Sequence, residues 1–273
     1  MSLQGLQVIV MRLGGFALGR AGGGEERNEP HIHWIIGGSP IAYHNCVVRA
    51  DLTPEQADAE IAASIERFRA RGVPGSWHVG PSMRPADLRD RLRAQGFTGC
   101  GPGGEPGMAA DLRALDALDE AIAMPTVPEG LTIERVRDDG TLAQWARVLS
   151  LGFGEGEQEA FWVREVYARI GLGDDVPWRH YLGRLGGEPV ATTSVFFAAG
   201  VAGLYFISTA PQYRRRGIGT AITLASLRAA RELGYEMAVL GASSMGYRTY
   251  QRLGFREYCR IGVPECAPAA APR

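Results

Sequence analysis

The hydrophobic and polar positions of the chain form short runs of two kinds: some alternate, and others repeat every three or four residues. Two apolar runs, residues 32–36 and 41–48, are separated by the turn 37–40, which contains glycine and proline, and they predict two strands. Residues 13–30 contain clustered glycines and charges without apolar periodicity. We therefore expect a poorly ordered or lid-like segment there.

A helix whose two ends carry recognisable capping residues is predicted next in the first half of the chain. Thr53 suits the N-cap, Pro54 suits the first helical position, and Gln56 completes a capping box with Thr53. The periodic pattern ends near Gly72. Apolar residues at spacings of three and four form one face of this helix: Ala57, Ile61, Ile65 and Phe68. The further elements expected in this half are a strand at 77–79, a helix at 85–95 and a strand from Phe97.

The second half follows a stretch, residues 113–130, that predicts a helix and a proline-containing linker. The strands expected beyond it are 131–136, 180–185, 190–197, 204–209, 237–240 and 255–261. The helices expected are 142–153, 159–170, 218–233 and 245–253. This organisation predicts two domains, residues 1–124 and 130–265.

One part of the element order occurs in both halves. Residues 77–80 form a short predicted strand before a helix that ends in the glycine and phenylalanine of 95–97. Residues 239–241 precede a helix that ends in the same way at 253–255. We interpret this repetition as two copies of one fold.

The composition narrows the class of protein and the kinds of partner. Of the 273 residues, 45% are hydrophobic and 22% are charged, which is typical of a globular protein with a buried core. The formal net charge of −1 argues against nucleic acid or an anionic membrane as a partner. No apolar run approaches the ~20 residues that span a bilayer. The start of the chain has no signal-peptide pattern and its four cysteines are scattered, so we expect a cytoplasmic protein whose oligomeric state is not predicted.

The segment that carries chemistry is the loop between the strand at 204–209 and the helix at 218–233. Its arginines and glycines are Arg214, Arg215, Arg216, Gly217 and Gly219. The first turn of a helix has unpaired backbone N–H groups and the positive end of the helix dipole. Glycines let a phosphate approach the backbone, and arginines add positive charge around it. The loop therefore predicts a pyrophosphate site.

The residues after this loop distinguish it from two other classes of nucleotide-binding loop. Ile222 stands where a dinucleotide-binding G-x-G-x-x-G loop needs its third glycine, and no Lys-Ser/Thr pair follows as in a Walker loop. With the Tyr-x-x-Leu-Gly-Phe segment at 250–255, the strand, loop and helix resemble the GNAT superfamily of N-acetyltransferases over about residues 130–263. The resemblance implies acetyl-CoA as cosubstrate and an α/β (mixed) fold. We expect two GNAT-like units, each a central mixed sheet flanked by helices.

The resemblance also assigns roles to individual positions. Ile207 and Thr209 fall where the strand of the family offers backbone groups to the acetyl carbonyl and the pantetheine arm. Ser243 stands where many members have an asparagine that contacts the pantetheine, and Tyr250 matches the tyrosine that is the general acid in many members. The pyrophosphate loop of the family corresponds to Arg214, Arg216, Gly217, Gly219 and Thr220, with Arg215 adding charge.

The chemistry of the reaction suits Tyr250 and leaves the general base open. A phenol with a pKa of about 10 is protonated at neutral pH, whereas a thiolate leaving group with a parent pKa of about 8.5 benefits from a proton donor. Many relatives have a glutamate near the position of Gly203. Glu155, Glu157, His180 or water remain alternatives for the base.

The first half lacks a comparable cofactor loop. Its helix start at 53–58 carries Glu55 and Asp58 and no pair of glycines, so carboxylates already occupy the position that favours an anion. We expect no cofactor there, and either a structural role or a contribution to the acceptor site. His31 and His33 lie two apart on a predicted strand, but they have no third ligand at a suitable spacing, so we predict no metal site.

The predicted function is transfer of an acetyl group from acetyl-CoA to an amine of a small molecule or peptide. Backbone N–H groups near Ile207 are expected to stabilise the developing oxyanion. The alternative is a non-catalytic acyl-CoA sensor or binding module, because a glycine stands at position 203. The sequence does not identify the acceptor amine.

Overall fold

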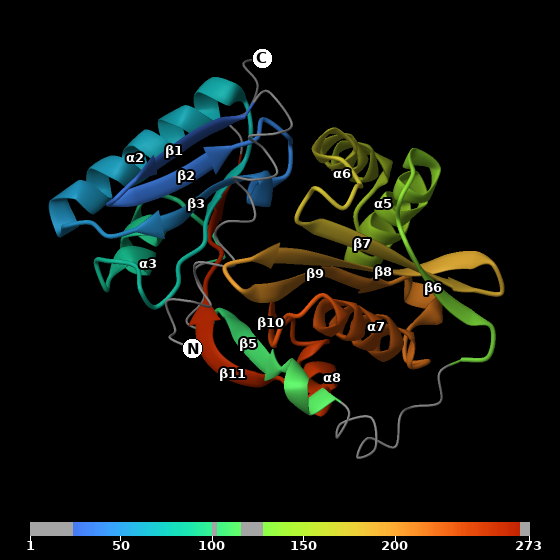
Figure 1. Cartoon of the computed structure of the whole chain (residues 1–273). Helices are drawn as coiled ribbons and strands as arrows, with labels where there is room; N and C mark the ends of the chain where they lie inside the picture. The colour runs from blue at the N-terminus through green and yellow to red at the C-terminus, as the bar shows by residue number, and fades with distance from the viewer. Residues whose placement is uncertain (1–23, 100–102, 116–127, 268–273) are drawn as a thin grey trace. The chain divides into compact units, whose positions relative to one another are not determined.

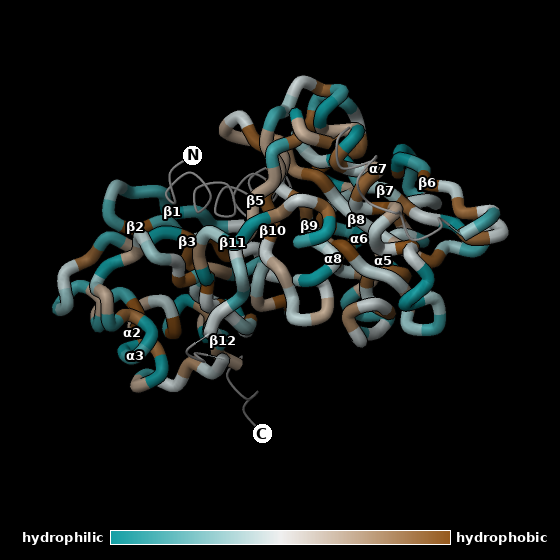
Figure 2. The backbone as a smooth tube through the Cα atoms, turned by 90° about the horizontal axis from the view of Figure 1, so that it is seen from below, coloured by the Kyte–Doolittle hydropathy of each residue, from teal (hydrophilic) through white to brown (hydrophobic). Residues whose placement is uncertain are grey.

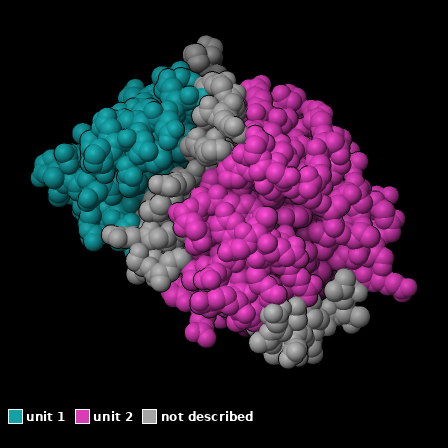
Figure 3. All heavy atoms as spheres, in the orientation of Figure 1, with its two compact units in different colours: residues 1–107, 259–273 teal, residues 108–258 magenta. Residues whose placement is uncertain are grey.

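The computed structural model describes residues 24–99, 103–115 and 128–267. The predicted segment 13–30 therefore lies mostly outside the described residues, as does most of the linker predicted at 113–130. The chain divides into two compact units, which Figure 3 shows in two colours: one comprises residues 1–107 and 259–273, and the other residues 108–258.

The first unit is built around a five-stranded mixed sheet. Its elements are β1 (Glu25–Glu29), β2 (Ile32–Ile36), β3 (Asn45–Ala50), α2 (Pro54–Arg71), β4 (Gly75–Trp77), α3 (Leu88–Ala94) and β12 (Glu265–Cys266). The strand order is β1-β2-β3-β4-β12. The β3–β4 pair is parallel and the other pairs are antiparallel. Apolar residues of the strands and of both helices form one buried cluster.

Helix α2 has the ends that the sequence predicts. The Thr53 hydroxyl accepts a hydrogen bond from the backbone N–H of Gln56, and the Gln56 side chain accepts one from the backbone N–H of Thr53. Gly72 follows the helix in the left-handed conformation, with φ of 63°. The predicted face of the helix packs into the core through Ala57, Ile61 and Phe68, with Ile65 partly buried against them.

Two expectations for the first unit were wrong in part. Residues 25–29 form strand β1, paired with β2, although the segment was expected to be poorly ordered. An edge strand with an exposed face can be polar, which is why apolar alternation did not mark it. The strand expected at 41–48 begins only at Asn45, because residues 42–44 form a 3₁₀ turn. The Asn45 amide holds this turn by donating to the carbonyl oxygens of Ser39, Ile41 and Pro74.

The second unit is built around a seven-stranded sheet with helices on both faces (Figure 1). Its strands are β5 (Glu105–Asp111), β6 (Leu131–Arg135), β7 (Trp178–Leu185), β8 (Glu188–Ala198), β9 (Val201–Thr209), β10 (Met237–Gly241) and β11 (Arg256–Ile261). Its helices are α5 (Asp139–Phe153), α6 (Glu157–Ile170), α7 (Ile218–Glu232) and α8 (Tyr247–Arg252). The strand order is β11-β5-β10-β9-β8-β7-β6.

The central strands of this sheet are covered on both sides. Strands β6 to β9 form an antiparallel meander, and β10 joins β9 in parallel. Figure 1 shows α5 and α6 over one face and α7 over the other. Burial on two faces explains the long apolar stretches in β8 and β9, which Figure 2 shows as hydrophobic segments inside the unit.

The repetition seen in the sequence is present in the folds of the two units. In the first, β3 leads into α2, then into β4 parallel to β3, and then into α3. In the second, β9 leads into α7, then into β10 parallel to β9, and then into α8. Each unit is thus a mixed sheet flanked by helices, as predicted.

The first unit is made of two separate chain segments, unlike the predicted domain 1–124. Strand β5 lies between β11 and β10 in the sheet of the second unit, whereas β12 lies beside β4 in the sheet of the first. Neither strand was predicted. The sequence of β5 contains a proline and a glycine, and β12 has only two residues, so both strands carry weak local signals.

Candidate active site

The predicted pyrophosphate loop follows directly from strand β9. A 3₁₀ turn at Pro211–Tyr213 leads to an extended Arg214, and Arg215 then adopts φ of 59°. Gly217 is the N-cap of α7 with φ of 77°, a left-handed conformation that favours glycine. No side chain caps this helix start, so the N–H groups of its first turn are available to a ligand.

The loop brings the end of β9 against the start of α7. A Cβ atom added to Gly219 would lie 3.5 Å from the Thr209 hydroxyl, so these two predicted residues are close neighbours. Thr220 is half-buried in the same helical turn. The structure thus gathers the loop residues and Thr209 at one place, as the resemblance implies.

The three arginines of the loop have different surroundings. The Arg214 guanidinium donates to the carbonyl oxygen of Thr209 at 3.1 Å and to that of Gly152 at 2.6 Å, tying the end of β9 to the end of α5. Arg215 and Arg216 are exposed. The Arg216 guanidinium lies 5.8 Å from the ring centroid of Tyr213. The Arg214 guanidinium is therefore held against the backbone, whereas the side chains of Arg215 and Arg216 extend into solvent.

Strand β9 contains a β-bulge before it reaches the loop. Thr192 pairs with Ser208 and Ser194 with Tyr205, so Phe206 and Ile207 together face Thr193. Phe206 has φ of 53°, which is rare for a residue with a bulky side chain. On its other side, β9 pairs with β10 only at Ala202 and Gly203 within the described residues. The bulge therefore lies in the part of β9 beyond its pairing with β10.

Tyr250 is held inside the core on helix α8. Its side chain is 7% exposed and belongs to a buried cluster against which Ile207 packs. Burial raises the pKa of the Tyr250 phenol to about 12, so the phenol stays protonated at neutral pH. A protonated phenol keeps its O–H as a hydrogen-bond donor for a ligand.

Ser243 lies in the turn between β10 and α8. Its hydroxyl accepts a hydrogen bond of 3.2 Å from the backbone N–H of Gly246, and its carbonyl oxygen accepts one from Tyr247. The residue is exposed. Its side chain supports the start of α8, in the same turn that leads to Tyr250.

In the folded structure, the side chain of Tyr205 lies over position 203. A Cβ atom there would lie 2.7 Å from the Cε2 atom of Tyr205 and 3.0 Å from its hydroxyl. The Tyr205 ring thus fills the space that a longer side chain at 203 would need. The Tyr205 hydroxyl is buried and has no hydrogen-bond partner among the residues described. Burial raises the pKa of this phenol above its ordinary value. The sequence did not single out Tyr205.

His180 lies on the face of the sheet covered by α5 and α6, surrounded by aromatic rings. The ring centroids of Trp145 and Tyr167 lie 4.7 and 4.5 Å from that of His180. The Nδ1 atom shares a hydrogen bond of 2.7 Å with the Ser194 hydroxyl, and Nε2 is buried without a partner. Burial, aided by the charges of two arginines, lowers the pKa of His180 to about 3. A ring with so low a pKa is a poor general base at neutral pH.

The two acidic candidates for the base lie at the start of α6. Glu157 is exposed and pairs with Arg147 at 3.4 Å. Partial burial and the neighbouring charge of Glu159 raise the pKa of Glu155. Neither residue has a hydrogen bond to the bulge or to Tyr250 in the described structure.

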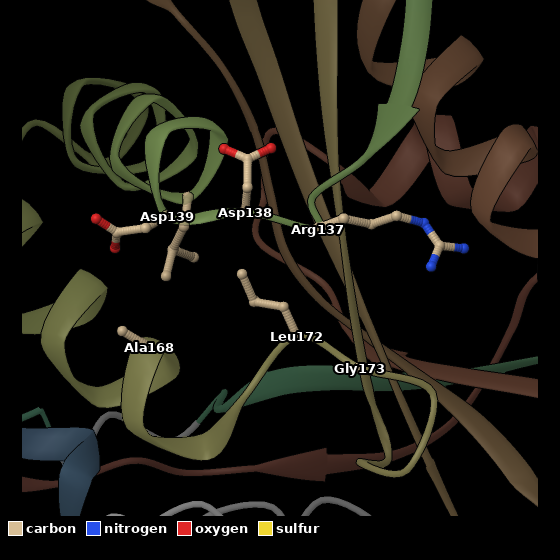
Figure 4. Close-up of a pocket in the computed structure, with 7 residues that line it drawn as sticks. Arg137, Asp138, Asp139, Ala168, Leu172 and Gly173 are labelled. Atoms are coloured by element: carbon tan, nitrogen blue, oxygen red, sulfur yellow. The ribbon is translucent and has the colours of Figure 1, made fainter.

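A depression of about 390 Å³ lies elsewhere in the second unit (Figure 4). It is lined by Arg137, Asp138, Asp139, Leu142, Ala168, Leu172 and Gly173. The Asp138 carboxylate caps helix α5 through the backbone N–H of Thr141, and Asp139 pairs with Arg164. None of the predicted site residues lines this depression.

The described residues contain no cluster of candidate metal ligands: no three of their His, Cys, Asp or Glu side chains are grouped as metal ligands would be. In β2, His33 Nε2 lies 2.7 Å from a Glu26 carboxylate oxygen. No helix in the same part of the chain has the length and apolar character to cross a bilayer.

Comparison with known proteins gives a family match for part of the second unit. Residues 174–255 match the acetyltransferase (GNAT) family, whereas none of the curated proteins matches the sequence. A GCN5-related N-acetyltransferase from Kribbella flavida superimposes with a TM-score of 0.68 at 18% identity, covering 96% of each chain. A tandem GNAT protein from the clavulanic acid biosynthesis pathway has a TM-score of 0.60 at 15% identity, covering 98% of this chain and 94% of its own.

Residues 174–255 therefore form a domain of the GNAT superfamily, which confirms the resemblance seen in the sequence. The coverage of both solved structures extends to the first unit, so the chain has the fold of two GNAT-like units. A functionally unknown conserved protein from Staphylococcus epidermidis shares this fold, with a TM-score of 0.65 at 14% identity over 90% of this chain and 94% of that one.

Proposed function

We propose that the second unit transfers an acetyl group from acetyl-CoA to an amine. The observation that carries this proposal is the uncapped start of α7, which follows an Arg-x-x-Gly-x-Gly loop at the end of β9 inside a GNAT domain. Unpaired N–H groups, the helix dipole and exposed arginines together favour a pyrophosphate.

The binding contributions follow from the position of each residue. The N–H groups of the first turn of α7, including those of Gly219 and Thr220, are suited to the pyrophosphate, with charge from Arg215 and Arg216. Ile207 belongs to the bulge of β9, and Thr209 lies between this bulge and the first turn of α7. We assign these backbone groups to the acetyl carbonyl and the pantetheine arm, with Ser243 at the far side of the arm.

The reaction requires a nucleophile, an oxyanion site and a proton donor. The amine nitrogen attacks the thioester carbonyl carbon, the C–S bond breaks, and the electron pair leaves on sulfur. The backbone N–H of Ile207 donates to the carbonyl oxygen as negative charge develops there. The Tyr250 hydroxyl donates to the departing sulfur and supplies its proton.

The proton lost by the amine has no obvious acceptor among the buried side chains. Gly203 has no carboxylate, and His180, whose pKa is lowered to about 3, holds a proton poorly. Water is the acceptor that we propose for this proton. An amine that is already uncharged at neutral pH would need no base before it attacks, so weakly basic amines belong in any test panel.

The proposal is tested with acetyl-CoA, a panel of amines and an assay for free thiol. We expect thiol release that depends on at least one amine, together with the acetylated amine in equal amount. Tight binding of acetyl-CoA without release on any amine would instead support a non-catalytic acyl-CoA binding module.

Gly219→Glu tests the site itself. The new carboxylate would lie at the second position of α7, where it repels a pyrophosphate, so acetyl-CoA affinity should fall at least a hundredfold by calorimetry. Gly140→Glu is the matched control, because Gly140 is the exposed second residue of α5 in the same unit. That control should keep wild-type affinity. Equal affinity in the wild type and Gly219→Glu would contradict the assigned site.

A further inference from the structure

The bulge in β9 is held by a side chain of the neighbouring strand. The Thr192 hydroxyl donates a hydrogen bond of 2.8 Å to the backbone carbonyl oxygen of Phe206. Thr192 is fully buried in β8. Phe206 has φ of 53°, a conformation that a bulky residue adopts only when its surroundings impose it. The hydroxyl thus bonds to the backbone at the strained residue itself.

The Phe206 ring is anchored on the face of the sheet covered by α5 and α6. The ring centroids of Trp145 and Tyr167 both lie 5.8 Å from that of Phe206, and the Trp178 ring lies 6.1 Å away. Residue 206 is therefore constrained twice, at its ring by aromatic packing and at its carbonyl by Thr192. Two such constraints can maintain a backbone conformation that is otherwise unfavourable for a bulky residue.

The carbonyl of Phe206 and the N–H of Ile207 belong to one peptide group. A trans peptide is planar, so its C=O and N–H bonds point in opposite directions. A hydrogen bond that fixes the direction of the Phe206 carbonyl therefore also fixes the direction of the Ile207 N–H. The proposed function makes this N–H the donor to the thioester oxygen.

We propose that Thr192 is a positioning residue, whose hydroxyl orients the Ile207 N–H toward the acetyl carbonyl. This inference rests on the proposed function, because it concerns the oxyanion donor of that reaction. An oxyanion donor must be oriented before the reaction to be effective, since its advantage over water is that it needs no reorganisation.

The chain offers a matched control in the next residue. Thr193 is also fully buried in β8, but its hydroxyl has no hydrogen-bond partner in the part of the chain that the structure describes. Thr192→Val and Thr193→Val remove the same hydroxyl from adjacent buried positions and leave side chains of the same shape. Only the first change removes a hydrogen bond to the bulge.

The test compares the affinities for acetyl-CoA and for CoA by calorimetry, because only acetyl-CoA has a carbonyl for the Ile207 N–H. We expect the wild type to prefer acetyl-CoA and Thr192→Val to lose this preference, with CoA affinity within about threefold of wild type. With an amine that supports turnover, kcat should fall about tenfold or more, while KM for acetyl-CoA changes less. Thr192→Ser should restore both properties, and Thr193→Val should resemble the wild type.

Several outcomes would overturn the inference. A Thr192→Val protein with wild-type preference and kcat would show that the hydroxyl does not position the donor. If Thr192→Val loses affinity for CoA and acetyl-CoA equally and has a lower melting temperature, the Thr192 hydroxyl only stabilises the fold. If Thr192→Val does not fold, Thr192→Ser must then match the wild type while Thr192→Ala loses the preference. A wild type that binds neither molecule would overturn the proposed function itself.

Discussion

Burial keeps the Tyr250 phenol protonated at neutral pH. The phenol is 7% exposed, and burial raises its pKa to about 12. A phenol with that pKa gives up its proton only as charge develops on a nearby base. A departing thiolate supplies such charge, so the hydroxyl is expected to act late in C–S cleavage rather than before it.

Tyr250→Phe should lower turnover by about a hundredfold, because general acids typically contribute at least that much. The change keeps the ring and its packing against Phe255, so acetyl-CoA affinity and melting temperature should barely change. Single-turnover measurements are the suitable readout, since they exclude product release.

Tyr247 on the same helix provides the control. Its hydroxyl donates a hydrogen bond of 3.0 Å to Glu257, so Tyr247→Phe should reduce stability by about 1 kcal/mol and leave single-turnover rates near wild type. Turnover within a few-fold of wild type in Tyr250→Phe would mean that the phenol only packs in the core.

The two helices that follow β3 and β9 begin in opposite ways. In α2, the Thr53 hydroxyl and the Gln56 side chain complete a capping box, and Pro54 has no N–H to offer. In α7, Gly217 leaves the first turn without a side-chain cap. The same place in the two units is therefore closed to an anion in one and open in the other.

We therefore expect one acetyl-CoA to bind per chain, in the second unit. Glu55 in the first turn of α2 adds negative charge that would repel a phosphate there. Calorimetric titration of the full chain should give a stoichiometry near one, and Gly219→Glu should abolish all of it. A stoichiometry near two, or heat that remains in Gly219→Glu, would show that the first unit also binds the cofactor.

Buried histidines link the stability of the molecule to pH. Burial lowers the pKa of His44 and His78 to about 4 in the first unit, and that of His180 to about 3 in the second. Below the ordinary pKa of about 6.5, the unfolded chain binds protons that these folded rings do not. The contribution of these three histidines to the free energy of unfolding therefore falls as the pH is lowered from about 6.5 toward 4.

Each of these histidines should contribute about 1.4 kcal/mol of lost stability per pH unit in that range. His180→Gln removes one of these three histidines. The free energy of unfolding of the variant, measured with urea, should therefore fall less steeply than that of the wild type between pH 6.5 and 4.5. This difference in slope is expected even where the variant is less stable than the wild type at pH 7.5. An unchanged slope in His180→Gln would refute the assignment.

The sequence alone determined the parts of this protein that depend on near neighbours. The capping box of α2, the ends of most helices and the Arg-x-x-Gly-x-Gly loop before α7 are all encoded within a few residues. Hydrophobic periodicity located the meander β6–β9, because each strand buries its own apolar residues. The fold class and the loop could be predicted because both have such local causes.

The tertiary structure decided the features that depend on distant partners. The bulge at Phe206 requires Thr192 from another strand and aromatic rings from α5 and α6, and no local pattern marks it. The Tyr205 ring lies over Gly203 only once the strand is folded. The places of β5 and β12 in their sheets depend on backbone pairing, which is nearly independent of side-chain identity and so leaves little trace in the sequence.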